Sequence, residues 1–211
     1  MARDEAWSAG RRAFEIEAEA VAVAGVVIGE DAFMRAVELL AGAERIAASG
    51  CGHSGIACQH FAHLMCCIER PARFISPAEA VDGATGYLKA GDVMLFASRG
   101  GKTQELLPIL DICLRKGVKV ISVTENLESP LAQGADVVLP MKVTRETDRW
   151  NSQGTTSFTV QCVLFDALQA ALVEYTGYQN EQFAVIHPGG AVGARLRAGG
   201  GRCPLTTADA R

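Results

Sequence analysis

The chain has 211 residues, of which 49% are hydrophobic and 21% charged, a composition typical of one folded domain with a full core. A formal net charge of −4 argues against a protein that binds nucleic acid through a basic surface. The longest apolar runs, such as 18–28, are interrupted and too short to cross a bilayer, and no signal-peptide core follows the charged N-terminus. We therefore expect a cytoplasmic protein with neither a nucleic-acid nor a membrane partner.

Two helices are expected before the first strand. Residues 5–28 are rich in Ala and Glu, with apolar residues at helical intervals, and Gly29 is a plausible end. Asp31 then looks like the N-cap of a second helix, Ala32–Ala41. We expect residues 1–44 to form a helical packing arm whose long helix could pair with another subunit.

From residue 45 onward, expected strands and helices alternate. The expected strands are Arg45–Ser49, Arg73–Ile75, Asp92–Ser98, Lys119–Thr124 and Asp136–Pro140. The expected helices are Gly55–Glu69, Pro77–Leu88 (a loop or short helix), Thr103–Lys116, Ser129–Gln133 and Thr155–Gly177, with a loop at Lys142–Gly154. This alternation predicts one α/β domain over residues 1–197, with a parallel sheet covered by helices on both faces. The Gly- and Ala-rich end, residues 198–211, is expected to be a flexible tail.

Two glycine-rich turns follow two of the expected strands. The first glycine turn is Gly50-Cys51-Gly52-His53-Ser54-Gly55, and the second is Ser98-Arg99-Gly100-Gly101-Lys102-Thr103. A turn between a strand and a helix presents backbone N–H groups and a helix N-terminus to an anion. Either turn alone also fits a purely structural role, but two hydroxyl-bearing turns at two strand ends suggest one phosphate held between them.

Two nucleotide motifs come close to these turns. A P-loop would need glycine where the chain has Phe96, so a nucleoside-triphosphate site is excluded there. The spacing of Gly50, Gly52 and Gly55 matches the dinucleotide fingerprint, but the acidic residue expected about 20 residues later is absent from residues 74–77. Dinucleotide binding is therefore a minor alternative.

Seven cysteines without a Cys-x-x-Cys pair indicate reduced thiols rather than a disulfide framework. His60, His63 and Cys67 could share one helix face and bind zinc. Ordinary half-buried side chains are the simpler interpretation, because structural zinc usually takes four ligands from two elements. We expect no metal and no cofactor.

Further motifs extend over most of the chain. They are GCGHSG (50–55), SPAEAVDGATGYLKAGDV (76–93), SRGGKTQE (98–105), KVTRETD (142–148), TTSFT (155–159) and HPGGAVGARL (187–196). Together they resemble the sugar isomerase (SIS) domain, and specifically the arabinose-5-phosphate isomerases, from about Gly50 to Leu196. The last motif is the most specific. Longer members carry nucleotide-sensing repeats after it, which we expect to be missing here.

The resemblance implies a three-layer αβα sandwich with a five-stranded parallel sheet, and a homodimer or homotetramer with active sites at subunit contacts. It also implies a sugar phosphate held by hydroxyls and backbone N–H groups of both turns. The implied substrate-binding residues are Gly52, Ser54, Ser98, Gly100, Gly101 and Thr103. The family has a serine at position 100 and an acid at position 102, where Lys102 could contact the phosphate or lie in solvent.

The catalytic residues of the family are only partly retained. Glu105, Glu146 and His187 match, whereas His53 replaces a lysine and Asp82 a histidine. These two changes call the substrate into question more than the reaction type. Each matching residue also has an ordinary structural interpretation, as a helix-start acid, a loop charge and a turn residue. His53, Asp82 and His187 could also form a small metal site.

Aldose–ketose isomerisation needs a base that moves a proton between neighbouring carbons and a second group that opens the ring or carries the hydroxyl proton. We assign Glu146 as the base and His187 as the acid/base. Glu105 would orient one of these or bind sugar hydroxyls, and His53 would support the enediolate oxygen. The sequence thus predicts a phosphosugar isomerase, with arabinose 5-phosphate and ribulose 5-phosphate as the first substrate pair. Isomerisation of another phosphosugar, a non-catalytic sugar-phosphate sensor, and a lyase or etherase on an amino-sugar phosphate are the alternatives.

Overall fold

The computed structural model describes residues 2–197, and the structural statements below concern this part of the chain. The expected flexible tail, 198–211, lies outside the described residues. The strands are β1 (Ile46–Gly50), β2 (Ala72–Phe74), β3 (Val93–Ala97), β4 (Lys119–Thr124) and β5 (Val137–Pro140). The helices are α1 (Ala2–Val27), α2 (Glu30–Gly42), α3 (Gly52–Cys67), α4 (Pro77–Val81), the 3₁₀ helix η1 (Ala84–Tyr87), α5 (Leu107–Lys116), α6 (Pro130–Gln133), α7 (Thr155–Thr176), α8 (Asn180–Ile186) and α9 (Gly190–Arg197).

The strands form one parallel sheet in the order β2-β1-β3-β4-β5, which confirms the five-stranded sheet expected from the sequence. Gly50 at the end of β1 is aligned with Ala97 at the end of β3, and Ala97 with Val123 of β4. The carboxyl ends of these strands therefore share one edge. The strand order reverses between β1 and β3, because β2 lies on one side of β1 and the later strands on the other. Ligands of such sheets bind beyond the strand ends at this switch point.

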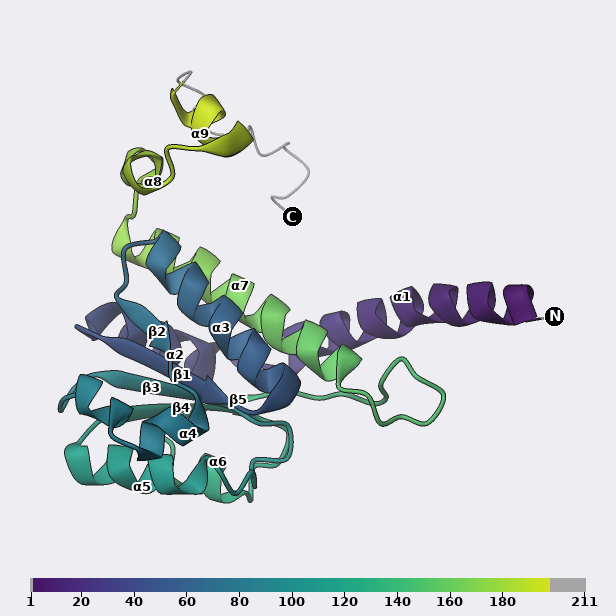
Figure 1. Ribbon diagram of the computed structural model, residues 1–211, viewed down its shortest axis with the longest axis horizontal. Helices are drawn as coiled ribbons and strands as arrows, with labels where there is room; N and C mark the ends of the chain where they lie inside the picture. Colours follow the sequence, from purple (N-terminus) through teal and green to yellow (C-terminus); the bar gives the residue numbers. More distant parts are fainter. Residues whose placement is uncertain (1, 198–211) are drawn as a thin grey trace.

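Helices cover both faces of the sheet, so that successive residues of a strand enter different cores (Figure 1). Val93 and Leu95 of β3 pack with α1, α2, α3 and α7. Met94 and Phe96 of the same strand pack with α4, η1, α5 and α6. Burial on both faces explains why this strand is a continuous apolar run rather than an alternating one.

Helix α7 is long and apolar enough to cross a membrane by length and composition alone, with a mean hydropathy of 1.4. In the fold it packs against α1, α2 and α3, and its residues Leu164, Phe165, Leu168 and Leu172 lie in the core. This packing accounts for its apolar composition without a membrane.

The expected starts of α2 and α5 were wrong. Gly29, in an extended conformation, precedes α2 as its N-cap, and Asp31 lies inside the first turn of α2 rather than capping it. The helix after the second glycine turn begins at Leu107 instead of Thr103. Pro108 explains the delay, because it has no N–H to donate to the carbonyl of residue 104 and its ring clashes with that carbonyl in a helix.

Two segments extend away from the layered body. The N-terminal part of α1 projects as a lone helix, and α8 with α9 lies beyond the end of α7 (Figure 1). Neither α8 nor α9 was expected from the sequence. No residue of α8 is buried. A helix that packs no face against the core needs no regular spacing of apolar residues, so the sequence gives no signal for it.

Candidate functional site

The first glycine turn joins the end of β1 to the start of α3. Helix α3 begins at Gly52, three residues earlier than the sequence pattern indicated. Gly55 has no room for a side chain, because a Cβ there would lie 2.7 Å from the carbonyl oxygen of Gly50. This close approach holds the helix start against the strand end. The N–H groups of residues 52–54 have no acceptor within the helix and no side-chain cap, so they can bind an anion.

The second glycine turn is organised around the hydroxyl of Ser98. Its Oγ accepts a hydrogen bond from the backbone N–H of Gly101 at 3.1 Å and lies 2.8 Å from Oγ1 of Thr103. Gly101 has a φ of +65°, and a Cβ at this position would overlap the hydroxyl of Ser129. Within the described residues, the backbone N–H groups of Gly100 and Thr103 have no hydrogen-bond acceptor. The turn therefore offers further donors at the same edge of the sheet.

A pocket of about 410 Å³ lies beside the first glycine turn. The residues that line it include Gly50, Cys51, Gly52, residues 76–78 and the exposed Glu105. Burial raises the pKa of the Cys51 thiol, and the nearby charge of Glu105 raises it further. The fold therefore brings Glu105, which belongs to the segment after β3, into contact range of the turn after β1.

Glu146 is buried, with 2% of its surface exposed, and both of its carboxylate oxygens are engaged. Its Oε1 accepts a hydrogen bond from Arg99 at 2.9 Å in an ion pair. Its Oε2 accepts the backbone N–H of Ser157 at 3.1 Å and lies 3.5 Å from Oγ1 of Thr155. Ser157 is the third residue of α7, so Glu146 caps a helix whose own N-cap, Gly154, has no side chain to do so.

Arg99 connects the second glycine turn to the loop that carries Glu146. Its guanidinium also donates to Glu125 Oε2 at 2.7 Å and to the carbonyl of Val143 at 2.8 Å. Glu125 in turn accepts the N–H of Val143. One cation thus holds two carboxylates and the start of the 142–154 loop in a single network.

His53 and Ser54 face the start of α7. The His53 ring lies against the backbone of Gly154 and makes an edge contact with Phe158 at a centroid distance of 6.1 Å. Ser54 Oγ accepts a hydrogen bond from Gln161 Nε2 at 3.2 Å. These two predicted site residues therefore lie near the α7 end that Glu146 caps.

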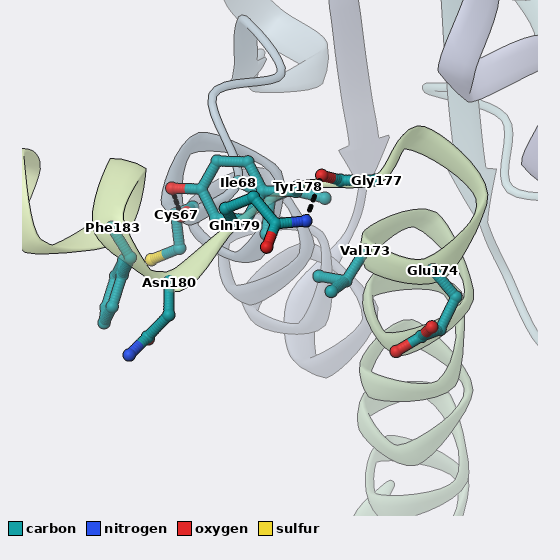
Figure 2. A pocket seen from close by; sticks show the side chains of 9 residues that line it. All are labelled: Cys67, Ile68, Val173, Glu174, Gly177, Tyr178, Gln179, Asn180 and Phe183. Atoms are coloured by element: carbon teal, nitrogen blue, oxygen red, sulfur yellow. Dashed lines mark hydrogen bonds between the residues drawn. The ribbon is translucent and has the colours of Figure 1, made fainter. Parts of the chain in front are cut away.

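His187 lies at the opposite end of the molecule. It follows α8, and its ring packs on Phe183 at a centroid distance of 5.0 Å. Phe183, Cys67 and Tyr178 line a second pocket, of about 390 Å³, where α3 and α7 end (Figure 2). Helix α3 has 16 residues and spans about 24 Å, so its own length separates the first glycine turn from this pocket. Within one chain, His187 does not meet the glycine turns.

Two other predicted residues are exposed. Asp82 ends α4 as its C-cap, and Lys102 is a residue of the second glycine turn. Neither forms an ion pair within the described residues.

The alternative zinc site is not formed in the described chain. His60 Nε2 lies 2.9 Å from Asp166 of α7, whereas His63 contacts Cys67, so the residues form two separate pairs. No group of three His, Cys, Asp or Glu side chains among the described residues lies close enough to hold a metal ion. The cysteines that the structure describes are free thiols.

Sequence reasoning missed two side chains of this region. Arg99 lies inside the motif of residues 98–105, but nothing in the sequence indicates that it would pair with Glu146, 47 residues away. Gln161 is fully buried in α7, where it contacts Ser54 while its Oε1 has no partner. A polar residue inside the apolar stripe of a core helix is a signal that could have identified it.

The parallel sheet with two glycine turns at its switch point defines an α/β domain of the kind whose ligand sites lie at the carboxyl edge of the sheet. The family model of the SIS domain matches residues 39–171, more than half of the chain. The chain therefore belongs to the SIS domain family.

The curated relatives include arabinose 5-phosphate isomerases. The chain is 41% identical over 187 residues to KdsD of Pseudomonas aeruginosa, which covers 88% of this chain and 57% of the relative. It is 34% identical over 194 residues to GutQ of Salmonella typhimurium, covering 92% and 60%. The chain thus spans less than two thirds of the length of these relatives.

Solved structures agree on the fold. A protein of Listeria monocytogenes, described as a candidate sugar-phosphate isomerase, superposes with a TM-score of 0.86 at 38% identity and covers 90% of this chain and all of the other. A protein of Escherichia coli CFT073, solved in complex with arabinose 5-phosphate, gives 0.83 at 26% identity over 89% of this chain and all of the other. Both comparisons support the three-layer architecture described above.

Proposed function

We propose that this chain is an aldose–ketose isomerase of phosphosugars, and that D-arabinose 5-phosphate and D-ribulose 5-phosphate are its first substrate pair. The observation that carries the proposal is the pocket that Glu105 lines together with Gly50, Cys51 and Gly52 of the first glycine turn, where α3 begins with open N–H groups. The similarity to arabinose 5-phosphate isomerases supports the choice of sugar.

The phosphate is expected between the two glycine turns. Residues 52–54 supply backbone donors from α3, and Gly100 with Thr103 supplies donors from the neighbouring turn. The hydroxyls of Ser98 and Thr103, which bond to each other in the free chain, can rotate toward a phosphate oxygen. Net binding then comes from many weak donors rather than from one fixed cation.

Two carboxylates are candidates for the base that moves the carbon proton. Glu146 is the residue assigned from the resemblance, and it accepts hydrogen bonds from Arg99 and from the N-terminus of α7. Glu105 lines the pocket beside the first glycine turn and is exposed. Oε1 of Glu146 accepts a single hydrogen bond and keeps a second lone pair, so its contact with Arg99 does not exclude proton transfer at this oxygen.

His187 would act in the site of a second copy of the chain. Its own glycine turns lie about the length of α3 away, so an acid/base role requires a subunit contact. A homodimer or homotetramer with shared active sites meets this requirement. His53 would lie on the α7 side of the same site.

The experiment that tests the function is proton exchange in heavy water. The protein is incubated with ribulose 5-phosphate, arabinose 5-phosphate and a panel of other ketose and aldose phosphates, and NMR follows deuterium entry beside the carbonyl and any new sugar. Interconversion is expected for one substrate pair. Glu146→Gln or Glu105→Gln should lower it about 100-fold or more, and the larger loss identifies the base.

Glu128→Gln is the matched control, because this exposed carboxylate lies outside the pocket. Phosphate-dependent binding without exchange across the whole panel would reject the isomerase and favour a sugar-phosphate sensor. Bond cleavage of an amino-sugar phosphate would favour the lyase alternative. The absence of a cofactor and a cytoplasmic location stay predictions, which activity after exhaustive dialysis against a chelator and cell fractionation can test.

A further inference from the structure

Gln161 is a polar residue inside the hydrophobic core. It lies in α7 with 1% of its surface exposed, and its neighbours Val160 and Leu164 on the same helix are buried apolar residues. Within the described residues, the side-chain carbonyl oxygen Oε1 of Gln161 has no hydrogen-bond partner. A buried carbonyl without a partner destabilises the folded state, so this glutamine calls for an explanation other than stability.

Two contacts determine the orientation of the Gln161 amide. Its Nε2 donates to Ser54 Oγ at 3.2 Å and to Met141 Sδ at 3.8 Å. A thioether sulfur is a weak acceptor and has no proton to donate. With the amide turned over, Oε1 would face this sulfur without a hydrogen bond. The NH₂ group therefore points toward Met141 and Ser54, and Gln161 is the donor in its contact with Ser54.

This contact leaves the hydroxyl proton of Ser54 available. A serine hydroxyl has one proton to donate and two lone pairs that accept. Because Gln161 donates to Oγ, it occupies a lone pair and not the proton, and no acceptor for that proton is found in the described chain. A hydroxyl that accepts one hydrogen bond is polarised and becomes a better donor.

Ser54 also lies where the phosphate is expected. It is the third residue of α3, and its own backbone N–H is one of the open donors of the first glycine turn. The side chain is only half-buried, so a ligand can reach it. The free hydroxyl proton and the open N–H groups therefore belong to the same helix N-terminus, which favours an anion.

We propose that Gln161 is a positioning residue for the phosphate: it holds the Ser54 hydroxyl as a donor. A phosphate dianion only accepts hydrogen bonds, so it matches a hydroxyl whose role as acceptor is already taken. Gln161 itself does not touch the ligand and acts through Ser54. The inference rests on the proposed function, because that function places a phosphate at the first glycine turn.

The test titrates inorganic phosphate into the full chain by isothermal titration calorimetry at about pH 8, where the dianion predominates. Gln161→Met has a similar size but no donor, and should raise the Kd for phosphate about fivefold to tenfold, the effect of about one net hydrogen bond. Gln161→Glu keeps the shape but offers only acceptor oxygens. It should raise the Kd by a larger factor, because it takes the Ser54 proton and can place a negative charge near the anion.

Gln169→Met is the matched control. Gln169 also lies in α7, and its Nε2 donates to the carbonyl of Leu64 in α3 at 2.8 Å. It therefore connects the same two helices, about two turns farther from the first glycine turn. Its loss should leave the Kd for phosphate unchanged.

Stability distinguishes a positioning role from a merely structural one. Gln161→Met removes the unpaired Oε1 from the core, so its midpoint of thermal unfolding should equal or exceed that of the wild type while its phosphate binding is weaker. A structural role predicts the reverse, a lower midpoint with unchanged binding. For a sugar phosphate that the chain isomerises, KM should rise by a similar factor, whereas kcat should change by less than about twofold.

A double-mutant cycle with Ser54→Ala tests whether Gln161 acts through the hydroxyl. Ser54→Ala should weaken phosphate binding, and adding Gln161→Met to it should cause no further loss. Equal losses from Gln161→Met with and without Ser54, or wild-type affinity in the Gln161 variants, would overturn the inference. If one of the two Gln161 variants does not fold, the other decides.

The proposed function and this inference can fail separately. A wild type that binds no phosphate would overturn the phosphate site and the role of Gln161 together. A wild type that binds phosphate and interconverts a sugar pair, but whose Gln161 variants bind phosphate as tightly as it does, would overturn the role of Gln161 alone.

Discussion

Arg99 is the residue on which the charges of the candidate site depend. Glu146 is almost fully buried, and its ion pair with the partly exposed Arg99 compensates part of the desolvation of its carboxylate. A buried carboxylate that loses its cationic partner still pays the desolvation penalty but no longer gains the attraction of the ion pair. Arg99 of the second glycine turn therefore helps to position Glu146, the proposed base, together with the loop that carries Glu146.

Replacing Arg99 by methionine should lower the free energy of unfolding by about 2–3 kcal/mol, less than for a fully buried pair because Arg99 is partly exposed. Urea denaturation monitored by circular dichroism measures this change. Arg115→Met is the control, because its pair with Asp111 is exposed and should contribute about 0.5 kcal/mol or less. The double variant Arg99→Met/Glu146→Gln should recover part of the loss, and a double variant less stable than Arg99→Met would contradict this account.

Gly101 and Gly100 are neighbours with opposite requirements. Gly101 has a positive φ and no space for a Cβ beside Ser129, whereas a Cβ at Gly100 meets open space. Gly101→Ala should therefore cost about 2 kcal/mol or more in unfolding free energy, and Gly100→Ala less than about 0.5 kcal/mol. Thermal unfolding of the two variants checks the difference, and equal stabilities would show that the turn is not constrained as described.

At the scale of elements, Asp136 joins the start of β5 to β4. Its carboxylate accepts hydrogen bonds from Lys119 Nζ and from the N–H of Val120, both at 2.8 Å. Burial alone would raise the pKa of Asp136, but the hydrogen bond from Lys119 and that from Val120 outweigh it, so the pKa lies below its usual value. The carboxylate is therefore more stable in the folded than in the unfolded chain.

The lowered pKa of Asp136 predicts a pH dependence of stability. A group whose pKa is lower in the folded state contributes stability above its unfolded pKa, and this contribution is lost as pH falls through the folded pKa. The stability difference between the wild type and Asp136→Asn should be present at pH 7 and shrink below about pH 4. Urea denaturation between pH 2.5 and 7 measures it, and a difference that stays constant over this range would contradict the assignment.

Helices and strands with a regular arrangement of apolar residues could be predicted from the sequence. Elements without such an arrangement could not. Strand β4 has the bounds expected for it, because an apolar run buried on both faces ends at polar residues. The start of α5 was misplaced because a favourable helix composition hides the effect of Pro108. Helix α8 was missed because it buries nothing.

Contacts between distant elements limit what could be predicted of the candidate site. The glycine turns could be found, because strand, turn and helix follow each other in the sequence. The pairing of Arg99 with Glu146 and that of Ser54 with Gln161 depend on tertiary packing, which leaves no local pattern. The motif that contains His187 predicted a role but not a position, and the fold places this residue at the far end of α3.

At the scale of the whole molecule, this separation of His187 from the glycine turns makes a prediction about mixed subunits. We expect Glu146→Gln and His187→Ala to be inactive when each is assembled alone, since every site then lacks one group. In a mixed pair, one site combines Glu146 and His187 from the two intact positions, while the other site lacks both. Random reassembly into pairs should therefore restore about a quarter of the wild-type interconversion rate, because half of the pairs are mixed and each has one working site.

Co-refolding of equal amounts of the two variants, followed by the same NMR measurement, provides this test. The control is a mixture of Glu146→Gln with the double variant Glu146→Gln/His187→Ala, in which no site has Glu146 and no activity should return. A mixture of the two single variants that stays inactive, in a protein whose wild type is active after the same treatment, would place both groups in one chain. It would then require the α8–α9 segment to fold back over its own body by about the length of α3.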